Sequence, residues 1–384
     1  LWFLVSSNIS YMRAFAAPTT LDMQLKKILI TFVDTFTILD CLEREFRALG
    51  IEVEKFATNG SGHWLHQYFF KKINRIAKKL KLIPSDGDLF AWSKFSFEKY
   101  REDQFAQAIE RFKPDLIFCI HGHKFGERVL RNTHIPKIGW WIEPNPNLQT
   151  LIRYAKLFDL YYSYDSEIVE LLKGHHVAAE YQSHVASTSD FYPIEEVNQD
   201  IDVLFYGAHS PWREQVLYAA YQTTKNIALF GSDWIQKCSL FTRQELELIL
   251  RGKGISGQGL NEMINRSKIV LAAQRLKDAT TGLDTRAFEI LASGALLLTD
   301  APKDLFRHFR DGEDLIVYQR AEELPNLIQA LLGGGIDTGK MRRSGREKVL
   351  HHLTYQALCQ KITKRFSEGF FEKQSAISDR VGSP

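Results

Sequence analysis

The residues whose types and spacing most clearly suggest chemistry lie in the segment TTGLDTRAFEILASGALLLTD, at positions 280–300. A polar loop that contains a glycine leads into a short helical stretch, and a second glycine ends that stretch before an apolar strand. Backbone N–H groups at the start of a helix form a site for anions. The N–H groups that could bind a diphosphate here belong to Thr281, Gly282, Leu283 and Asp284.

Arg286 and Glu289 add charged groups to the same segment. They are three residues apart, so a helix presents both of them on one face. A guanidinium can bind phosphate, and a carboxylate can accept hydrogen bonds from two ribose hydroxyls. The alternative is an ordinary pair of surface charges on a helix, and the spacing by itself favours that alternative.

Two histidines and a glutamate follow expected strands in the first half of the chain. His121 and His123 come after a strand at residues 115–120, and Glu143 comes after a strand at 137–142. A histidine at a strand end can donate a hydrogen bond to a substrate hydroxyl or carry a proton, and Glu143 could contact the substrate. Two histidines could also suggest a metal, but no third ligand is evident. A purely structural role is the remaining alternative.

Gly207 and Arg213 follow the expected strand at residues 203–206. A glycine at this point allows the close approach of a ligand to the backbone, and an arginine near the start of the next helix could bind a diphosphate. The alternative is a turn glycine followed by a solvated arginine.

The elements that must position these residues alternate between apolar strands and amphipathic helices. A strand, a helix at residues 38–49 and a second strand open the chain, and such a unit implies a right-handed crossover and a parallel sheet. The expected strands of the first half are 27–33, 51–56, 115–120, 137–142, 157–164 and 177–182. Those of the second half are 203–206, 227–230, 268–272, 295–299 and 314–317.

Two Rossmann-like α/β halves in series are therefore predicted, with ligands at the carboxyl ends of the strands. The first domain is expected over residues 23–194, a polar linker over 195–201 and the second domain over 202–345. Residues 346–372 are expected to form helices that pack back on the first domain. Residues 1–22 are interpreted as a disordered or non-native leader before Met23.

Composition limits the classes of function. The chain has 384 residues, of which 45% are hydrophobic and 25% are charged, and this is typical of a globular protein with two domains. A net charge of +3 argues against a nucleic-acid partner. The four cysteines are scattered, as in a reducing compartment, and no apolar run approaches the ~18 residues of a membrane span. We therefore expect a cytoplasmic protein.

A basic amphipathic helix is predicted over residues 69–84, within a longer helical region at 63–82. Its apolar stripe consists of Phe69, Ile73, Ile76 and Leu80. Such a helix could make a weak peripheral contact with an anionic membrane. The favoured alternative is a helix that covers the first sheet and exposes only its polar side.

The segment around Arg286 resembles the C-terminal domain of the retaining glycosyltransferases called glycosyl transferases group 1, in the branch of the CgeB-like spore-maturation proteins. The residues that carry the resemblance are Arg286, Phe288, Glu289, Ala292 and Gly294, followed by ALLLTD. The segments DVLFYGAHSPWR, SKIVL and EDLIVY also fit the pattern. In the first half it is carried by PKIGWWIEPNP, FDLYYSYDS and SDFYPI.

The resemblance implies the GT-B architecture, an interdomain cleft, and transfer of a sugar from a nucleotide-sugar donor with retention at the anomeric carbon. It implies no metal and no cofactor, and an acceptor that is a sugar, a lipid-linked molecule or a protein. It assigns Glu143 to the acceptor side and catalysis to His121 or His123. The residues that it assigns to donor binding are Gly207, Arg213, Thr281, Gly282, Leu283, Arg286 and Glu289. The parent family has two glutamates in this segment. The second matches Glu289, and the first would fall at Thr281 here. A nucleotide-sugar epimerase and a non-catalytic binding protein of the same fold remain alternatives.

Overall fold

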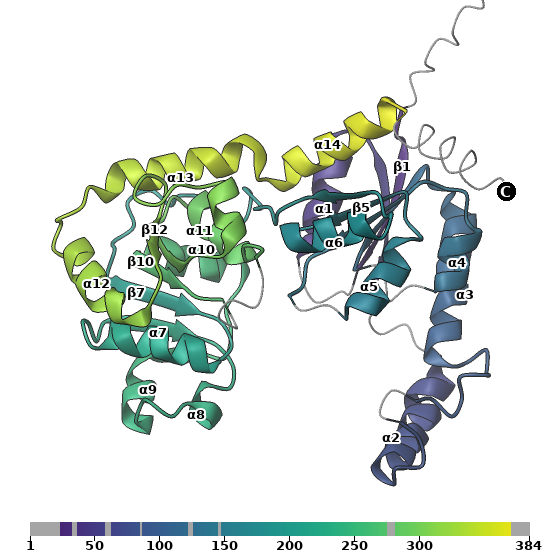
Figure 1. Ribbon diagram of the computed structural model, residues 1–384, viewed down its shortest axis with the longest axis horizontal. Helices are drawn as coiled ribbons and strands as arrows, with labels where there is room; N and C mark the ends of the chain where they lie inside the picture. Colours follow the sequence, from purple (N-terminus) through teal and green to yellow (C-terminus); the bar gives the residue numbers. More distant parts are fainter. Residues whose placement is uncertain are drawn as a thin grey trace, which may run out of the picture.

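The structure is a computed structural model that describes residues 24–32, 37–57, 63–84, 87–121, 126–144, 147–274 and 281–369. Two α/β domains lie side by side, and a long helical segment runs along one edge of both (Figure 1). Each domain contains a six-stranded, all-parallel sheet with helices around it. This confirms the predicted fold class.

The N-terminal sheet has the strand order β2-β1-β3-β4-β5-β6. Its strands are β1 (Lys27–Phe32), β2 (Glu52–Ala57), β3 (Leu116–Ile120), β4 (Lys137–Trp141), β5 (Leu160–Ser163) and β6 (Ala179–Tyr181). Its helices are α1 (Ile38–Ala48), η1 (His66–Phe70), α2 (Lys71–Lys79), α3 (Phe97–Phe112), α4 (Glu127–Asn132), α5 (Leu148–Ala155) and α6 (Ser166–Gly174).

The C-terminal sheet has the strand order β12-β11-β10-β7-β8-β9. Its strands are β7 (Ile201–Tyr206), β8 (Ile227–Phe230), β9 (Leu250–Gly252), β10 (Ser267–Ala272), β11 (Leu297–Asp300) and β12 (Ile316–Tyr318). Its helices are α7 (Pro211–Tyr221), α8 (Trp234–Lys237), α9 (Arg243–Ile249), α10 (Gly257–Asn265), α11 (Thr285–Ala292), η2 (Lys303–Arg307), η3 (Ala321–Glu323) and α12 (Leu324–Leu332).

Successive side chains of a strand point to opposite faces of the sheet. Helices cover both faces of each sheet, so both sets of side chains are buried. Ile28 and Ile30 of β1 pack with α1 on one face, whereas Leu29 packs with the helices of the other face. In the second sheet, Val203 and Leu204 of β7 likewise belong to opposite layers of the core.

Two consecutive helices connect the domains at the C-terminal end. Helix α13 (Thr338–His352) packs against α11, and α14 (Tyr355–Ser367) packs against α1 of the N-terminal domain. Between them, the N–H of Ala186 donates to the carbonyl of Leu353 at 2.8 Å, and the N–H of Tyr355 donates to the carbonyl of Ala186 at 3.1 Å. The boundary expected between residues 345 and 346 falls inside α13.

Helix α2 corrects the favoured interpretation of the basic segment. It projects away from the body of the N-terminal domain instead of covering its sheet (Figure 1). The four residues of its apolar stripe are all exposed. The periodicity predicted the helix, but a periodic stripe carries no information about what covers it. Across the described segments, every helix is too short or too polar to cross a bilayer.

Candidate functional site

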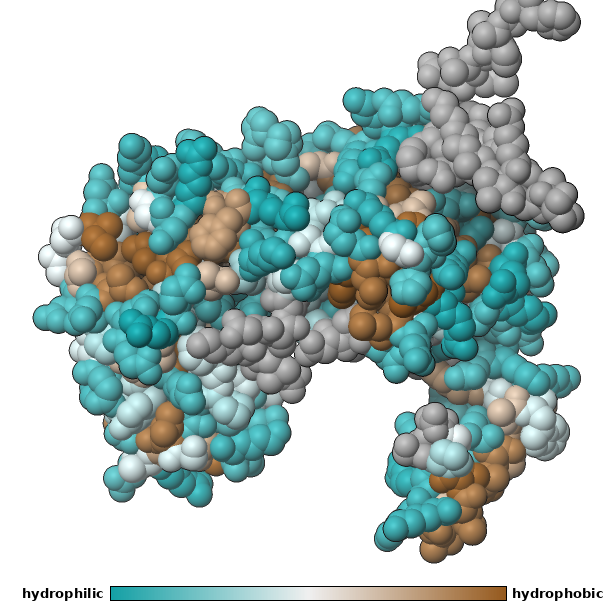
Figure 2. Space-filling view, viewed as in Figure 1, coloured by the Kyte–Doolittle hydropathy of each residue, from teal (hydrophilic) through white to brown (hydrophobic). Residues whose placement is uncertain are grey.

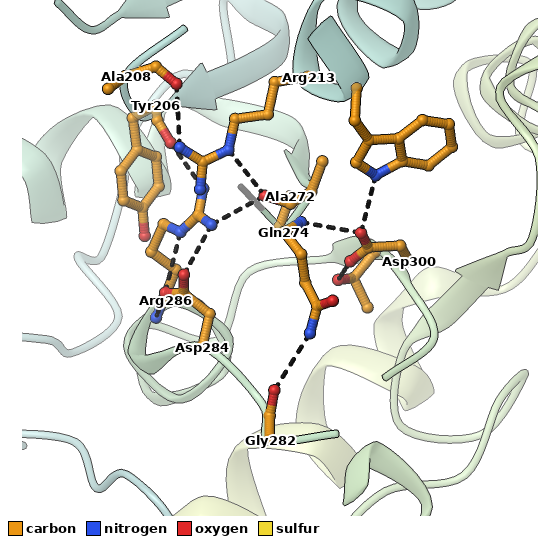
Figure 3. Close-up of polar contacts among 12 residues, drawn as sticks. Tyr206, Ala208, Arg213, Ala272, Gln274, Gly282, Asp284, Arg286 and Asp300 are labelled. Atoms are coloured by element: carbon orange, nitrogen blue, oxygen red, sulfur yellow. Dashed lines mark hydrogen bonds and ion pairs between the residues drawn. The ribbon is translucent and has the colours of Figure 1, made fainter. Parts of the chain in front are cut away.

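The candidate donor site lies where β7 and β10 end side by side, which is the point at which the chain reverses its direction across the second sheet. Ligands bind at such switch points in open α/β sheets because the loops after the two strands diverge there. The loop after β7 carries Gly207, the loop after β10 begins with Ala273, and the first turn of α11 supplies Arg286 (Figure 3). The structure thus brings together three of the residues around which the donor site was predicted: Gly207, Arg213 and Arg286.

Arg286 is buried and its guanidinium is held on several sides. Its Nε and Nη2 atoms donate to the two carboxylate oxygens of Asp284 at 3.0 and 2.8 Å. Its Nη1 donates to the carbonyl of Tyr206 at 2.9 Å, and Nη2 donates to the carbonyl of Ala273 at 2.9 Å. This arrangement is a built feature of the fold and not an exposed surface pair.

Arg213 lies on the first turn of α7 and is also buried. Its Nε donates to the carbonyl of Ala273 at 3.0 Å, and its Nη1 donates to the carbonyl of Ala208 at 3.0 Å. These neutral carbonyls orient the guanidinium, and the positive charge of Arg213 helps to lower the pKa of Asp284. Two buried cations therefore share one environment.

Gly207 is the backbone position against which both guanidiniums pack. A Cβ atom placed there would lie 2.9 Å from Nη1 of Arg213 and 3.2 Å from Nη1 of Arg286. Its φ of +145° is also a conformation that side chains rarely adopt. A glycine that admits a ligand was predicted here; in the structure the two arginines approach it.

The loop that carries Gly207 is anchored by buried polar contacts. The indole N–H of Trp234 donates to the carbonyl of Gly207 at 2.9 Å, and His209 Nε2 lies 2.6 Å from Glu214 Oε2. The other oxygen of Glu214 accepts hydrogen bonds from the backbone N–H and the hydroxyl of Ser239. His209, Glu214 and Cys238 form the one group of potential metal ligands among the described residues. The existing donors to Glu214 explain that group without an ion.

Asp284 is the carboxylate that partly balances the two arginines. Burial by itself raises the pKa of Asp284, but the charge and hydrogen bonds of Arg286 outweigh burial and hold this pKa well below its ordinary value. Asp284 also caps α11, because its side chain accepts the backbone N–H of Arg286. Asp300, at the end of β11, accepts from the indole N–H of Trp212 at 3.1 Å and from the N–H of Gln274 at 2.8 Å. Burial raises the pKa of Asp300.

Glu289 lies five residues after the capping Asp284, half-buried on α11. Burial raises the pKa of Glu289 to about 7, and the negative charge of Asp284 acts in the same direction. The hydroxyl of Tyr206 faces this carboxyl and acts in the opposite direction. That hydroxyl oxygen is buried and has no hydrogen-bond partner within the described part of the chain. Glu289 is the partly exposed member of this pair, and its carboxyl is the group that a hydroxyl-bearing ligand could reach.

The segment before α11 contacts the N-terminal domain. The N–H and hydroxyl of Thr281 donate to the two carboxylate oxygens of Asp165 at 3.1 and 2.6 Å. A Cβ at Gly282 would lie 2.4 Å from the ring of Tyr164, and Leu283 is buried in the core of the second domain. In this arrangement the N–H of Thr281 is already used, so donor binding by that group requires the contact with Asp165 to open.

The structure also brings together two residues predicted for the other side of the site. His121 ends β3 with a φ of +71°, and its Nε2 lies 3.5 Å from Oε1 of Glu143, beyond the end of β4. The imidazole is buried, while half of the Glu143 side chain is exposed. His123 lies outside the described residues.

His184 is a candidate that sequence reasoning did not find. It follows β6, and its ring lies against those of Tyr164 and Trp140, with centroid distances of 4.7 and 6.3 Å. Burial lowers the pKa of His184 to about 4, and the negative charge of Asp284 acts in the opposite direction. His184 therefore lies within electrostatic reach of the carboxylate that pairs with Arg286.

A family model described as "Glycosyl transferase-like" matches residues 207–364. The match begins at Gly207 and includes Arg213, Arg286 and Glu289. A comparison of the sequence with curated proteins finds no match.

Solved structures with the same fold cover both domains. The sucrose-phosphate synthase of Thermosynechococcus elongatus has a TM-score of 0.64 at 15% identity, over 90% of this chain and 99% of that one. A glycosyltransferase from Rickettsia africae has a TM-score of 0.60 at 12% identity, over 90% and 98%. HepE from Anabaena, in complex with UDP and glucose, has a TM-score of 0.58 at 13% identity, over 89% and 100%. At these identities the likeness establishes the fold. The family model adds a likeness to glycosyltransferases over residues 207–364, which is less than half of the chain.

Proposed function

We propose that this protein is a glycosyltransferase that takes a sugar from a nucleotide-sugar donor and transfers it to an acceptor. The observation that carries the proposal is the pair of buried guanidiniums, Arg213 and Arg286, packed against Gly207. The chain keeps two cations at the carboxyl ends of β7 and β10, where a ligand binds in this class of sheet. Such a pair is suited to a doubly charged phosphate group.

The two guanidiniums favour a diphosphate as the ligand. Asp284 pairs with Arg286 through two hydrogen bonds, and Arg213 donates to the carbonyls of Ala273 and Ala208. A diphosphate would place negative charge beside both cations. The same cations would stabilise the charge that develops on the leaving nucleoside diphosphate, which is a large term in transfer reactions of this kind. No metal ion is needed for that step, and we expect none and no resident cofactor.

Glu289 is the proposed binding group for the ribose. Its carboxylate lies beside the Tyr206 hydroxyl, on the same helix as Arg286. A carboxylate can accept two ribose hydroxyls in parallel, which fixes the nucleoside while the arginines hold the phosphates. Gly207, Thr281, Gly282 and Leu283 complete the proposed donor site.

His121 and Glu143 are the proposed groups on the acceptor side. They lie together at the ends of neighbouring parallel strands, β3 and β4. His121, with its ring at 3.5 Å from a carboxylate, can donate a hydrogen bond to a hydroxyl or receive its proton. His123 remains a candidate for the same role. Retention of configuration and membership of the CgeB-like branch belong to this proposal, as does a cytoplasmic location.

The experiment is a titration of the full chain with UDP, GDP, ADP and their sugar derivatives, monitored by calorimetry and thermal shift. UDP-sugars come first, since HepE was solved with UDP and with UDP-glucose. A ligand at one hundred times its Kd adds ~2.7 kcal/mol of apparent stability. A donor that binds is then incubated with candidate acceptors, and transfer of its sugar to the acceptor is measured. Binding of no nucleotide would overturn the proposal, and conversion of the donor without an acceptor would indicate an epimerase.

A further inference from the structure

The most exposed apolar surface of the described chain lies on an arm of the N-terminal domain. This arm comprises residues 63–84 and 87–96 and contains η1 and α2. It projects from the domain on the side away from α13 and α14 (Figure 1). Its tip is therefore remote from the packed cores of both domains.

One side of the arm is apolar and open to solvent (Figure 2). The stripe on α2 follows the spacing of a helical face, and rings next to it extend the surface. The exposed fractions are 57% for Trp64, 61% for Tyr68, 54% for Phe69, 44% for Ile73, 59% for Ile76, 62% for Leu80 and 77% for Trp92. A contiguous surface of this kind marks an interaction site on a protein that is otherwise well packed.

The arm is internally ordered, so its exposed side is not a hydrophobic core left incomplete. Phe70 stacks on Phe90 with ring centroids 4.0 Å apart. Asn74 donates to Asp88 at 2.6 Å and accepts the N–H of Leu89 at 3.0 Å. Asn74 follows Ile73 by one residue, so its side chain lies about 100° around α2 from the stripe, and these contacts fix the helix in its place.

All lysine, arginine, aspartate and glutamate positions in the helical part of the arm, residues 63–84, are basic. Residues 63–84 contain no acidic residue. Their basic residues are Lys71, Lys72, Arg75, Lys78, Lys79 and Lys81. On the helix, Lys72 and Lys79 border the apolar stripe on one side. Long basic side chains in this position can lie along apolar surface and reach a layer of negative charge.

We propose that the arm docks on the surface of an anionic lipid bilayer, with its apolar stripe in the interfacial layer and its basic residues on the headgroups. Aromatic residues such as Trp64 and Trp92 are favoured at that depth, and an amphipathic helix with one charged and one apolar side lies in the plane of the interface. A second copy of the arm is a poorer occupant, because two surfaces of the same sign would repel each other. The docking does not depend on whether the protein transfers a sugar.

The test measures co-sedimentation of the full chain with vesicles. We expect binding to vesicles of mixed phosphatidylcholine and phosphatidylglycerol, little binding to phosphatidylcholine alone, and loss of binding at high salt, since salt screens the attraction to headgroups. Equal binding to both vesicle types, or binding to neither, overturns the proposal.

Two pairs of substitutions separate the apolar and the charged contributions. Ile76→Ser with Leu80→Ser removes part of the stripe, and Lys72→Glu with Lys79→Glu reverses charge beside it. Each pair should lower the partition coefficient at least about tenfold. The matched controls on the C-terminal domain are Ile235→Ser with Leu248→Ser, which are 45% and 65% exposed, and Lys237→Glu with Arg243→Glu. They should bind vesicles as the wild type does.

Further measurements on the same variants keep the result interpretable. Melting temperature and circular dichroism must match the wild type, since all four arm positions are exposed. Nucleotide titration should be unchanged, which separates failure of docking from failure of the proposed function. Sedimentation velocity without lipid should show no arm-dependent dimer. A dimer that the Ser variants abolish would overturn the proposal and assign the surface to a second copy.

Discussion

Arg213 and Arg286 donate hydrogen bonds to the same backbone oxygen, the carbonyl of Ala273, at 3.0 and 2.9 Å. Two cations that converge on one carbonyl at the end of β10 repel each other unless a negative charge lies nearby. Asp284 supplies part of that charge from the side of Arg286. Arg286 forms the ion pair with Asp284, whereas Arg213 donates to the carbonyls of Ala273 and Ala208, so removal of the two arginines should have different effects.

Arg213→Met should weaken the binding of a nucleoside diphosphate by roughly 10- to 150-fold, the effect of losing charge-assisted hydrogen bonds of ~1.5–3 kcal/mol. Binding of the nucleoside alone should change little. Arg213 donates to two backbone carbonyls, and Asp284 keeps its ion pair with Arg286 when Arg213 is removed. Calorimetric titration with both ligands measures the difference. Arg243→Met, at a 77% exposed side chain on α9, is the control and should bind as the wild type does.

Arg286→Met should weaken diphosphate binding too, but it should also lower the melting temperature. Its removal leaves the Asp284 carboxylate without its cation, and breaking a buried pair costs about 3 kcal/mol or more. Because the Asp284 side chain is partly exposed, we expect the loss of stability to be near the lower end of that cost. Denaturant unfolding of Arg286→Met, Arg213→Met and wild type gives the comparison. Equal stability of the two variants would contradict the assignment of Asp284 to Arg286.

Gly207→Ala should destabilise the protein by about 1–3 kcal/mol and weaken donor binding. The added methyl would lie 2.9 Å from Arg213 at a backbone φ of +145°, and both the clash and the strained conformation oppose it. Gly254→Ala is the control, because nothing lies within 4 Å of its Cβ position. Chemical denaturation and nucleotide titration give the two readouts. If the Gly207 variant behaves like the Gly254 variant, the packing of the arginines on Gly207 contributes neither to stability nor to donor binding.

Much of the fold could be predicted because strands of parallel sheets are short apolar runs. The expected strand at 227–230 has the bounds of β8, and the other expected strands overlap those of the structure. β9 was missed, since its three residues, Leu250–Gly252, contain an arginine and a glycine and show no alternation. It pairs only at the edge of the sheet, beside β8. Tertiary pairing, and not local pattern, makes it a strand.

The candidate site could be predicted only in part. Arg286 and Glu289 stood out because their helix follows a polar, glycine-containing loop, and Gly207 because it ends an apolar strand. His184 gave no signal, since its position beside Tyr164 depends on tertiary packing within the first domain. The contact of Thr281 with Asp165 gave none either, because the two residues lie in different domains. Tertiary contacts of either kind are not encoded in periodicity or spacing.

His121→Ala should lower turnover more than it lowers donor affinity, because His121 lies with Glu143 in the first domain and the proposed phosphate site lies in the second. General acid or base catalysis by a positioned group contributes typically 10²- to 10⁴-fold. Steady-state kinetics and donor titration on the same protein separate the two effects. His134→Ala, at an exposed histidine before the start of β4, is the control. Full turnover in both His121→Ala and the corresponding variant of His123 would make this loop structural.

Glu289 should make donor binding depend on pH near neutrality. Burial raises its pKa to about 7 in the free protein, against 4.5 as its ordinary value, so much of the carboxyl is protonated there. Ribose hydroxyls bind the ionised form as donors, and proton release must accompany binding. Donor affinity should therefore fall by up to about tenfold as the pH is lowered from 8 to 6.

Glu289→Gln separates this effect from titration of the phosphates, which is common to both proteins. The variant should lose the additional pH dependence and bind with lower affinity at pH 8, since its amide offers one acceptor only. The effect on stability has the opposite direction. A carboxyl whose pKa is raised on folding contributes stability that is fully present below about pH 4.5 and is lost as the pH rises through about 7. Calorimetry and unfolding of both proteins across this range give the test; identical pH profiles would remove Glu289 from the donor site.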